Sequence, residues 1–89
     1  MWWQLIDIQQ LTKDDYFILE PYRATIKHVA NGGSTSKSEA WWSMNTVNII
    51  HTGEHLISGC TACMVEDYRR FANMIEEYEI KLFNETNTN

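Results

Sequence analysis

The longest hydrophobic pattern in the chain runs through its second half. Apolar or small residues recur there at alternating spacings of four and three, with polar and charged residues between them. The series is Ile57, Thr61, Met64, Tyr68, Phe71, Ile75, Tyr78 and Leu82. This heptad-like spacing predicts a long helix with one buried stripe. Because the rest of the chain is too short to cover such a stripe, we expect copies of the chain to associate.

A shorter helix is predicted over residues 12–30. Thr12 and Asp15 have the spacing of a capping box, in which each side chain bonds the backbone amide of the other residue. An apolar stripe follows at spacings of three and four. Its members are Tyr16, Leu19, Tyr22, Ile26 and Val29. Pro21 lies within this stripe and cannot donate a backbone hydrogen bond, which predicts a kink or a restart of the helix there.

A short polar connection joins the two helices. Gly32 and Gly33 are typical of a helix end, so residues 31–36 form the predicted loop. The second helix is predicted over residues 37–83, and the sequence leaves open whether it breaks near Gly53 or Gly59.

These patterns predict an all-α fold within a single domain, residues 1–89. Residues 1–10 form an apolar arm, and residues 84–89 are expected to be a disordered tail. Because the connection is short, the two helices should form an antiparallel hairpin with a long second helix. Because the stripe is unsupported, we expect this hairpin to be homo-oligomeric.

Charge is distributed unevenly along the chain. The net charge is −5, yet residues 21–37 carry Arg23, Lys27 and Lys37 and no acidic residue. A chain without a broad basic face is not expected to bind duplex nucleic acid. The basic segment fits one compact anion, or else a solvated face near a helix C-terminus, where the helix dipole favours cations.

Other features argue against a membrane protein and an enzyme. No stretch is long and apolar enough to be a signal peptide or a membrane span, so we expect a cytoplasmic protein with reduced thiols. Four metal-capable residues lie within 51–63, but one straight helix cannot bring them to a single zinc ion. They are His51, His55, Cys60 and Cys63. A zinc site would need a helix break at Gly59 or a site shared between copies of the chain. Cys-x-x-Cys here lacks a preceding strand, which argues against a thioredoxin-like redox role. We predict no enzyme activity and no cofactor.

Two segments resemble a known phage family. They are Leu11-Thr12-x-x-Asp15-x-x-Ile18-Leu19-Glu20-x-Tyr22-Arg23-x-Thr25 and His55-Leu56-x-x-Gly59-x-x-Ala62. Both are similar to helices of the small hairpin sponges that sequester cyclic oligonucleotide signals of bacterial CBASS immunity. A related hairpin occurs in sponges that counteract Thoeris. The resemblance implies an anti-defence viral protein that binds a cyclic dinucleotide or trinucleotide without cleaving it, in the cytoplasm of the bacterial host.

The resemblance also implies site residues and an assembly. Arg23 falls where the family has a phosphate-binding lysine, Thr25 falls at a ligand-contacting threonine, and Lys27 shares a helix face with Arg23. Ile8, followed by Gln9, stands where the family has a base-stacking tyrosine. Base stacking would then come from Trp2 or Trp3 of the arm, whose other role is to pack on a neighbour, or from Tyr22. The family forms homo-oligomers, so a trimer or hexamer is expected.

Two alternatives stay open at this stage. The chain is also consistent with a small acidic inhibitor that binds a protein, as an anti-CRISPR or a nucleic-acid mimic would, through Glu76, Glu77 and Glu79. The other alternative is a coiled-coil assembly protein that binds no ligand.

Overall fold

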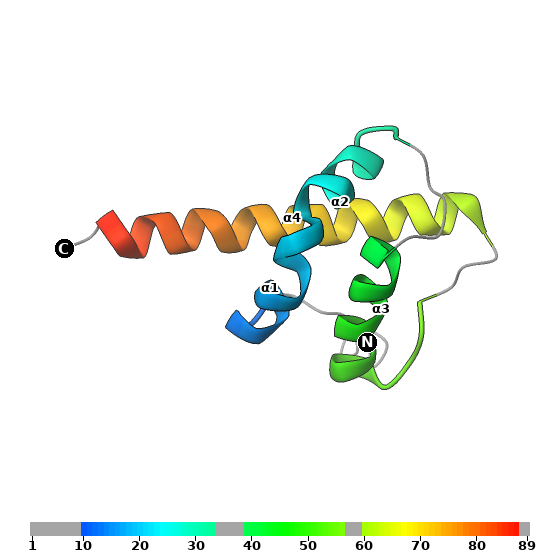
Figure 1. Cartoon of the computed structure of the whole chain (residues 1–89), viewed down its shortest axis with the longest axis horizontal. Coiled ribbons are helices and arrows are strands. Elements are labelled where there is room, and N and C mark those ends of the chain that lie inside the picture. The colour runs from blue at the N-terminus through cyan, green and yellow to red at the C-terminus, as the bar shows by residue number, and fades with distance from the viewer. Residues whose placement is uncertain (1–9, 34–38, 57–59, 88–89) are drawn as a thin grey trace, which may run out of the picture.

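One long helix sets the dimensions of the molecule (Figure 1). The computed structural model describes residues 10–33, 39–56 and 60–87. Its elements are α1 (Lys13–Leu19), the 3-10 helix η2 (Glu20–Tyr22), α2 (Arg23–Ala30), α3 (Glu39–Thr52) and α4 (Thr61–Asn87). The described residues form helices and no strand, which confirms the all-α prediction. α1 and α2 cross α4, and α4 packs mainly against α2.

The first helical segment begins and bends where the sequence predicts. Both bonds of the capping box are present: the Thr12 amide donates to Asp15 Oδ2 at 2.9 Å, and the Asp15 amide donates to Thr12 Oγ1 at 3.1 Å. Pro21 lies in η2, which separates α1 from α2. The proline lacks the amide hydrogen that a continuous α-helix needs at this point, so the chain tightens locally and then continues.

Glycine ends α2 in the expected way. Gly32 has φ of 107°, a left-handed conformation that glycine adopts without strain. The Gly32 amide donates to the Val29 carbonyl at 3.0 Å, and the Gly33 amide donates to the His28 carbonyl at 2.9 Å. This pair of bonds is a Schellman motif, which satisfies carbonyls that the helix end would otherwise leave unbonded.

A single helix over residues 37–83 does not form. α3 ends at Thr52, and Gly53 (φ 77°) turns the chain away while its amide donates to the Ile49 carbonyl at 2.8 Å. Two buried asparagines of α3 hold the turn: Asn48 Nδ2 donates to the Glu54 carbonyl at 2.8 Å, and Asn45 Oδ1 accepts the Leu56 amide at 2.7 Å. The chain therefore forms more helices than the two expected from its hydrophobic pattern.

The core covers the middle of the predicted stripe. Tyr68, Phe71 and Ile75 of α4 are fully buried and belong to one cluster with side chains of α1, α2 and α3. The Trp41 ring of α3 lies 5.7 Å from the Tyr68 ring, centre to centre. Over this stretch, the cover that the sequence assigned to a second copy comes from the chain's own helices. Ile57, at the start of the stripe, lies outside the described residues.

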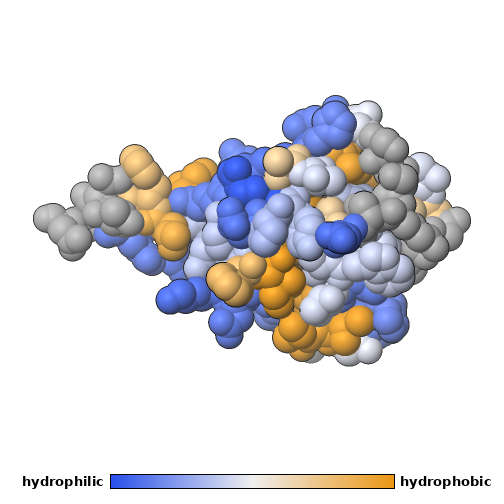
Figure 2. All heavy atoms as spheres, in the orientation of Figure 1, coloured by the Kyte–Doolittle hydropathy of each residue, from blue (hydrophilic) through white to orange (hydrophobic). Residues whose placement is uncertain are grey.

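The C-terminal end of α4 extends beyond the other helices (Figure 1). Its apolar side chains are exposed there, Ile80 by 53%, Leu82 by 42% and Phe83 by 67%, and Figure 2 shows apolar surface on this end. α4 continues to Asn87, so residues 84–87 of the predicted disordered tail are helical, and residues 88–89 lie outside the described residues. The physical reason is that no glycine or proline follows Thr61 to stop the helix.

Candidate functional site

The predicted phosphate-binding arginine holds a carboxylate of its own chain. Arg23 Nε lies 2.6 Å from Glu79 Oε2, and Arg23 Nη2 lies 2.8 Å from Glu79 Oε1. In this bidentate geometry a guanidinium binds a carboxylate or a phosphate most strongly. Glu79 thus occupies the position that the sequence assigned to a ligand phosphate.

Two further side chains complete this cluster around Glu79. The Tyr16 hydroxyl donates to Glu79 Oε2 at 2.7 Å, and its ring stacks on Tyr78 with centres 4.7 Å apart. Lys27 Nζ lies 3.4 Å from Glu79 Oε1. Tyr16, Arg23 and Lys27 share one side of α1 and α2 because they are seven and four residues apart. The cluster therefore links α1 and α2 to α4.

The contacts within the cluster shift the pKa values of Glu79 and Tyr16. The hydrogen bonds from Arg23, followed by the bond from Tyr16 and the nearby positive charges, lower the pKa of Glu79 to about 2 despite its partial burial. Burial first, and then the bond to Glu79, raises the pKa of Tyr16 to about 12. The carboxylate is therefore charged at any physiological pH.

Acid should weaken the fold through Glu79. Its pKa in the folded protein lies below its ordinary value of 4.5, so its contribution is complete above that value and is lost as the pH falls from about 5 towards 2. Since Arg23 and Glu79 are partly exposed, we expect Glu79→Gln to cost about 1–2 kcal/mol at pH 7 and much less at pH 2.5. Urea unfolding at both pH values measures this.

Glu77→Gln is the matched control for that experiment. It removes the same charge from an exposed position of α4. If the free energy of unfolding changes by the same amount between pH 7 and pH 2.5 in both variants, Glu79 makes no specific contribution to stability.

A polar hollow of about 280 Å³ lies beside the Glu79 cluster, between the end of α2 and α4. In the described part of the chain its lining carries two cations, Lys27 and Arg69, and one carboxylate, Glu76. The other lining residues are Ala30, Asn31, Ala72 and Asn73. Arg69 Nε donates weakly to the Ala30 carbonyl at 3.4 Å, which leaves the rest of the guanidinium's donors for another acceptor. The lining is therefore suited to an anion that also accepts amide hydrogen bonds.

The other predicted ligand contacts are not gathered at this hollow. Thr25 is exposed on α2, and a residue two positions from Arg23 lies about 200° around the helix from it. Trp2, Trp3, Ile8 and Gln9 lie outside the described residues. The sequence pointed to Lys27, but it missed Arg69 as its partner, because 42 positions separate them and no local pattern joins them.

A second polar cluster joins α1 to α3. Asp15 is 2% exposed, and its Oδ2 lies 2.6 Å from His51 Nε2 in addition to bonding the Thr12 amide. His55 instead contacts Asn45, with Nδ1 and Nδ2 3.0 Å apart. The two histidines thus have separate partners. Among the described residues, no group of three or more His, Cys, Asp or Glu side chains is placed to hold a metal ion.

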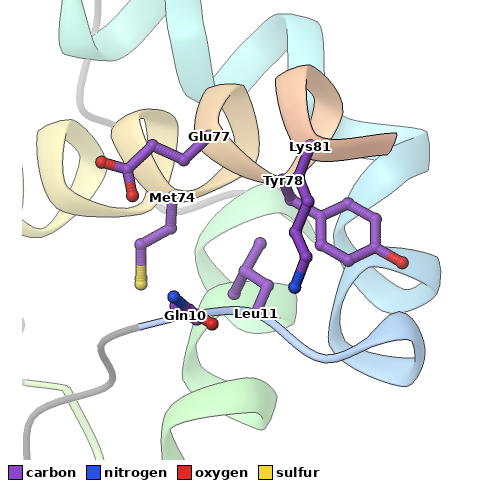
Figure 3. Close-up of a pocket in the computed structure, with 6 residues that line it drawn as sticks. All are labelled: Gln10, Leu11, Met74, Glu77, Tyr78 and Lys81. Atoms are coloured by element: carbon purple, nitrogen blue, oxygen red, sulfur yellow. The ribbon is translucent and has the colours of Figure 1, made fainter. Parts of the chain in front are cut away.

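The smaller hollow in Figure 3 does not match a ligand site in size. It is lined by Gln10, Leu11, Met74, Glu77, Tyr78 and Lys81. Its volume of about 60 Å³ is far below the roughly 300–1,000 Å³ of typical small-molecule pockets. The hollow at Lys27 and Arg69 is the better candidate.

Comparisons with protein-family models, curated protein sequences and solved structures gave no significant match. In the described ranges, no helix has both the length and the apolar character needed to cross a bilayer.

Proposed function

We propose that this protein is a binding protein that sequesters a cyclic oligonucleotide through its phosphates and leaves it chemically unchanged. The observation that carries the proposal is the hollow lined by Lys27 and Arg69. Two cations on facing helices, with the Asn31 and Asn73 amides beside them, offer charge-assisted and neutral hydrogen bonds to one phosphodiester and its sugar or base.

The Glu79 cluster has a positioning role in this proposal. Glu79 holds Arg23 in two bonds and lies 3.4 Å from Lys27 Nζ, and Lys27 also lines the hollow. An ammonium has three donors, and Glu79 uses one of them. Arg23 then acts on the ligand through the net positive charge of the cluster rather than by direct contact. Thr25 does not line the hollow and has no role in the proposed site.

The size of the hollow supports assembly. Its volume of about 280 Å³ is at the low end for a small-molecule pocket, so a cyclic dinucleotide or trinucleotide would extend beyond it. A second copy of the chain would cover the remainder, and the exposed apolar end of α4 offers surface for association. We therefore propose a homo-oligomer, a trimer or hexamer, with each ligand between subunits. The resemblance to phage sponges suggests anti-defence activity in the bacterial cytoplasm.

Ligand-induced thermal stabilisation tests the proposal. A cyclic dinucleotide or trinucleotide at a hundred times its Kd should stabilise the protein by about 2.7 kcal/mol. Lys27→Ala and Arg69→Ala should each weaken binding about ten- to a hundredfold, since a hydrogen bond to a charged group is worth about 1.5–3 kcal/mol. Binding is measured by calorimetry, and the ligand is recovered intact by chromatography.

Lys81→Ala is the control, because it removes one positive charge from an exposed position of the same helix, outside the hollow. Its affinity should stay within about twofold of the original. If none of the cyclic nucleotides raises the melting temperature, or if all three variants bind equally, the proposed site is wrong.

A protein-binding inhibitor is the second candidate, favoured by the exposed acidic residues of α4. Glu66, Glu76, Glu77 and Glu85 are all exposed. A stoichiometric protein partner that is lost on charge reversal of Glu76 and Glu77, but retained in Arg69→Ala, would favour this candidate over the sponge.

A further inference from the structure

Two thiols meet at the first turn of α4. Cys60 directly precedes the helix, and its carbonyl accepts the Met64 amide at 3.0 Å, as an N-cap residue does. The Cys63 amide donates to Cys60 Sγ at 3.2 Å, so the Cys60 side chain folds back over the turn towards Cys63. Both residues are reduced and partly exposed.

The two thiols differ in pKa because of their positions at the helix end. The hydrogen bond from Cys63, followed by the backbone amides of Cys63 and Ala62, lowers the pKa of Cys60. The same contact with Cys60, together with burial and the negative charge of Asp67, raises the pKa of Cys63. Thiolates are stabilised at helix N-termini, and the thiolate is the reactive form of cysteine. Cys60 is therefore the better attacking thiol, and Cys63 is suited to be the resolving thiol.

We propose that Cys60 and Cys63 are a redox site that exchanges with small-molecule or protein disulfides, of which oxidised glutathione is the simplest. The pair reacts stoichiometrically, as a modification site of this protein, and catalyses nothing. This proposal rests on the contact between the two residues at the helix end and is independent of the ligand-binding proposal.

The exchange has two balanced steps. The Cys60 thiolate attacks one sulfur of glutathione disulfide; an S–S bond forms to Cys60, the original S–S bond breaks, and one glutathione leaves as thiolate. Cys63 then loses its proton to solvent and attacks Cys60 Sγ, which forms the Cys60–Cys63 bond and releases the second glutathione thiolate. The protein is oxidised by two electrons, and the disulfide is reduced to two thiols.

The sequence argued against a redox role because no strand precedes the two cysteines. The exchange itself requires a nucleophilic thiolate and a second thiol within reach. The Cys63 amide donates to Cys60 Sγ, which favours the thiolate form of Cys60 and places the two residues against one another on one turn. The three-residue spacing places both side chains on the first turn of one helix. The exchange reaction therefore needs only residues 60 and 63 and their helix end.

Equilibration of the intact protein with reduced and oxidised glutathione tests the proposal. Intact-mass spectrometry should show the original chain losing two hydrogens without a lasting glutathione adduct. Cys63→Ser should instead accumulate one adduct on Cys60, because no second thiol can release it. Cys60→Ser keeps a good N-cap residue. Its remaining thiol, Cys63, should react with oxidised glutathione at roughly one third of the rate of Cys60 in Cys63→Ser, or more slowly still.

Circular dichroism checks that both variants keep their helices, which excludes unfolding as the cause of a changed rate. An original chain that stays reduced at every glutathione ratio, or that stops at a glutathione adduct, would overturn the proposal. Equal rates at Cys60 and Cys63 would overturn the assignment of Cys60 as the attacking thiol.

Discussion

Phe71→Ala is expected to cost about 3–5 kcal/mol of folding free energy. Phe71 is fully buried in the middle of α4, within the cluster where side chains of α1, α2 and α3 meet. Its loss removes a large apolar side chain from that cluster and leaves a cavity, and both effects destabilise the fold. Since small domains are stable by only about 5–15 kcal/mol, this loss is a large share of the total stability.

Urea unfolding followed by circular dichroism measures this effect, and Phe17→Ala is its control. The two substitutions are chemically identical, but the Phe17 side chain is 81% exposed on α1. The control should change the unfolding free energy by no more than about 0.5 kcal/mol. Comparable losses at both positions would contradict the arrangement of the core.

Asp15→Ala has the second largest expected effect, about 2–3 kcal/mol. The Asp15 carboxylate is buried and accepts the Thr12 amide at 2.9 Å while lying 2.6 Å from His51 Nε2. Its removal undoes half of the capping box and leaves His51 without its partner on α1. The helix start and the contact between α1 and α3 should therefore weaken together, which chemical unfolding at pH 7 measures.

Asp14→Ala separates this effect from a general loss of negative charge at the helix start. Asp14 is the exposed neighbour of Asp15 in the same first turn. Its substitution should cost about 0.3–1 kcal/mol, the usual size of a helix-dipole interaction at the surface. If the two variants unfold at the same urea concentration, the contact between Asp15 and His51 adds nothing to the cap.

Local patterns predicted the local structure well. The capping box at Thr12, the bend at Pro21 and the turn at Gly32 each depend on residues a few positions apart, and each is present. Much of the heptad-like stripe is buried, including Tyr68, because its spacing matches one face of a helix. These features depend on steric and hydrogen-bonding preferences that act within a few turns.

The break between α3 and α4 was harder to predict. A glycine in a helix costs only about 1 kcal/mol relative to alanine, so Gly53 alone does not decide between a weak point and an end. The side chains of Asn45 and Asn48 stabilise the helix end at this glycine, because they form hydrogen bonds with the backbone of the turn. Once the helix is divided, α3 can fold back on the core and replace the second copy that an unbroken helix would need.

The candidate site was predicted only in part. Arg23 and Lys27 were correctly placed on one helix face, but their partner Glu79 is 56 and 52 positions away in the sequence. Nothing in the spacing of the acidic residues shows which of them turns towards α2. Arg69 was missed for the same reason, because its place beside Lys27 depends on how α2 crosses α4.

The asparagines of α3 also bear on the order in which the fold assembles. The bonds from Asn48 to the Glu54 carbonyl and from the Leu56 amide to Asn45 join residues six and eleven positions apart. Contacts between such near neighbours close quickly, at little entropic cost. The turn after α3 can thus close through local contacts alone, without help from α4.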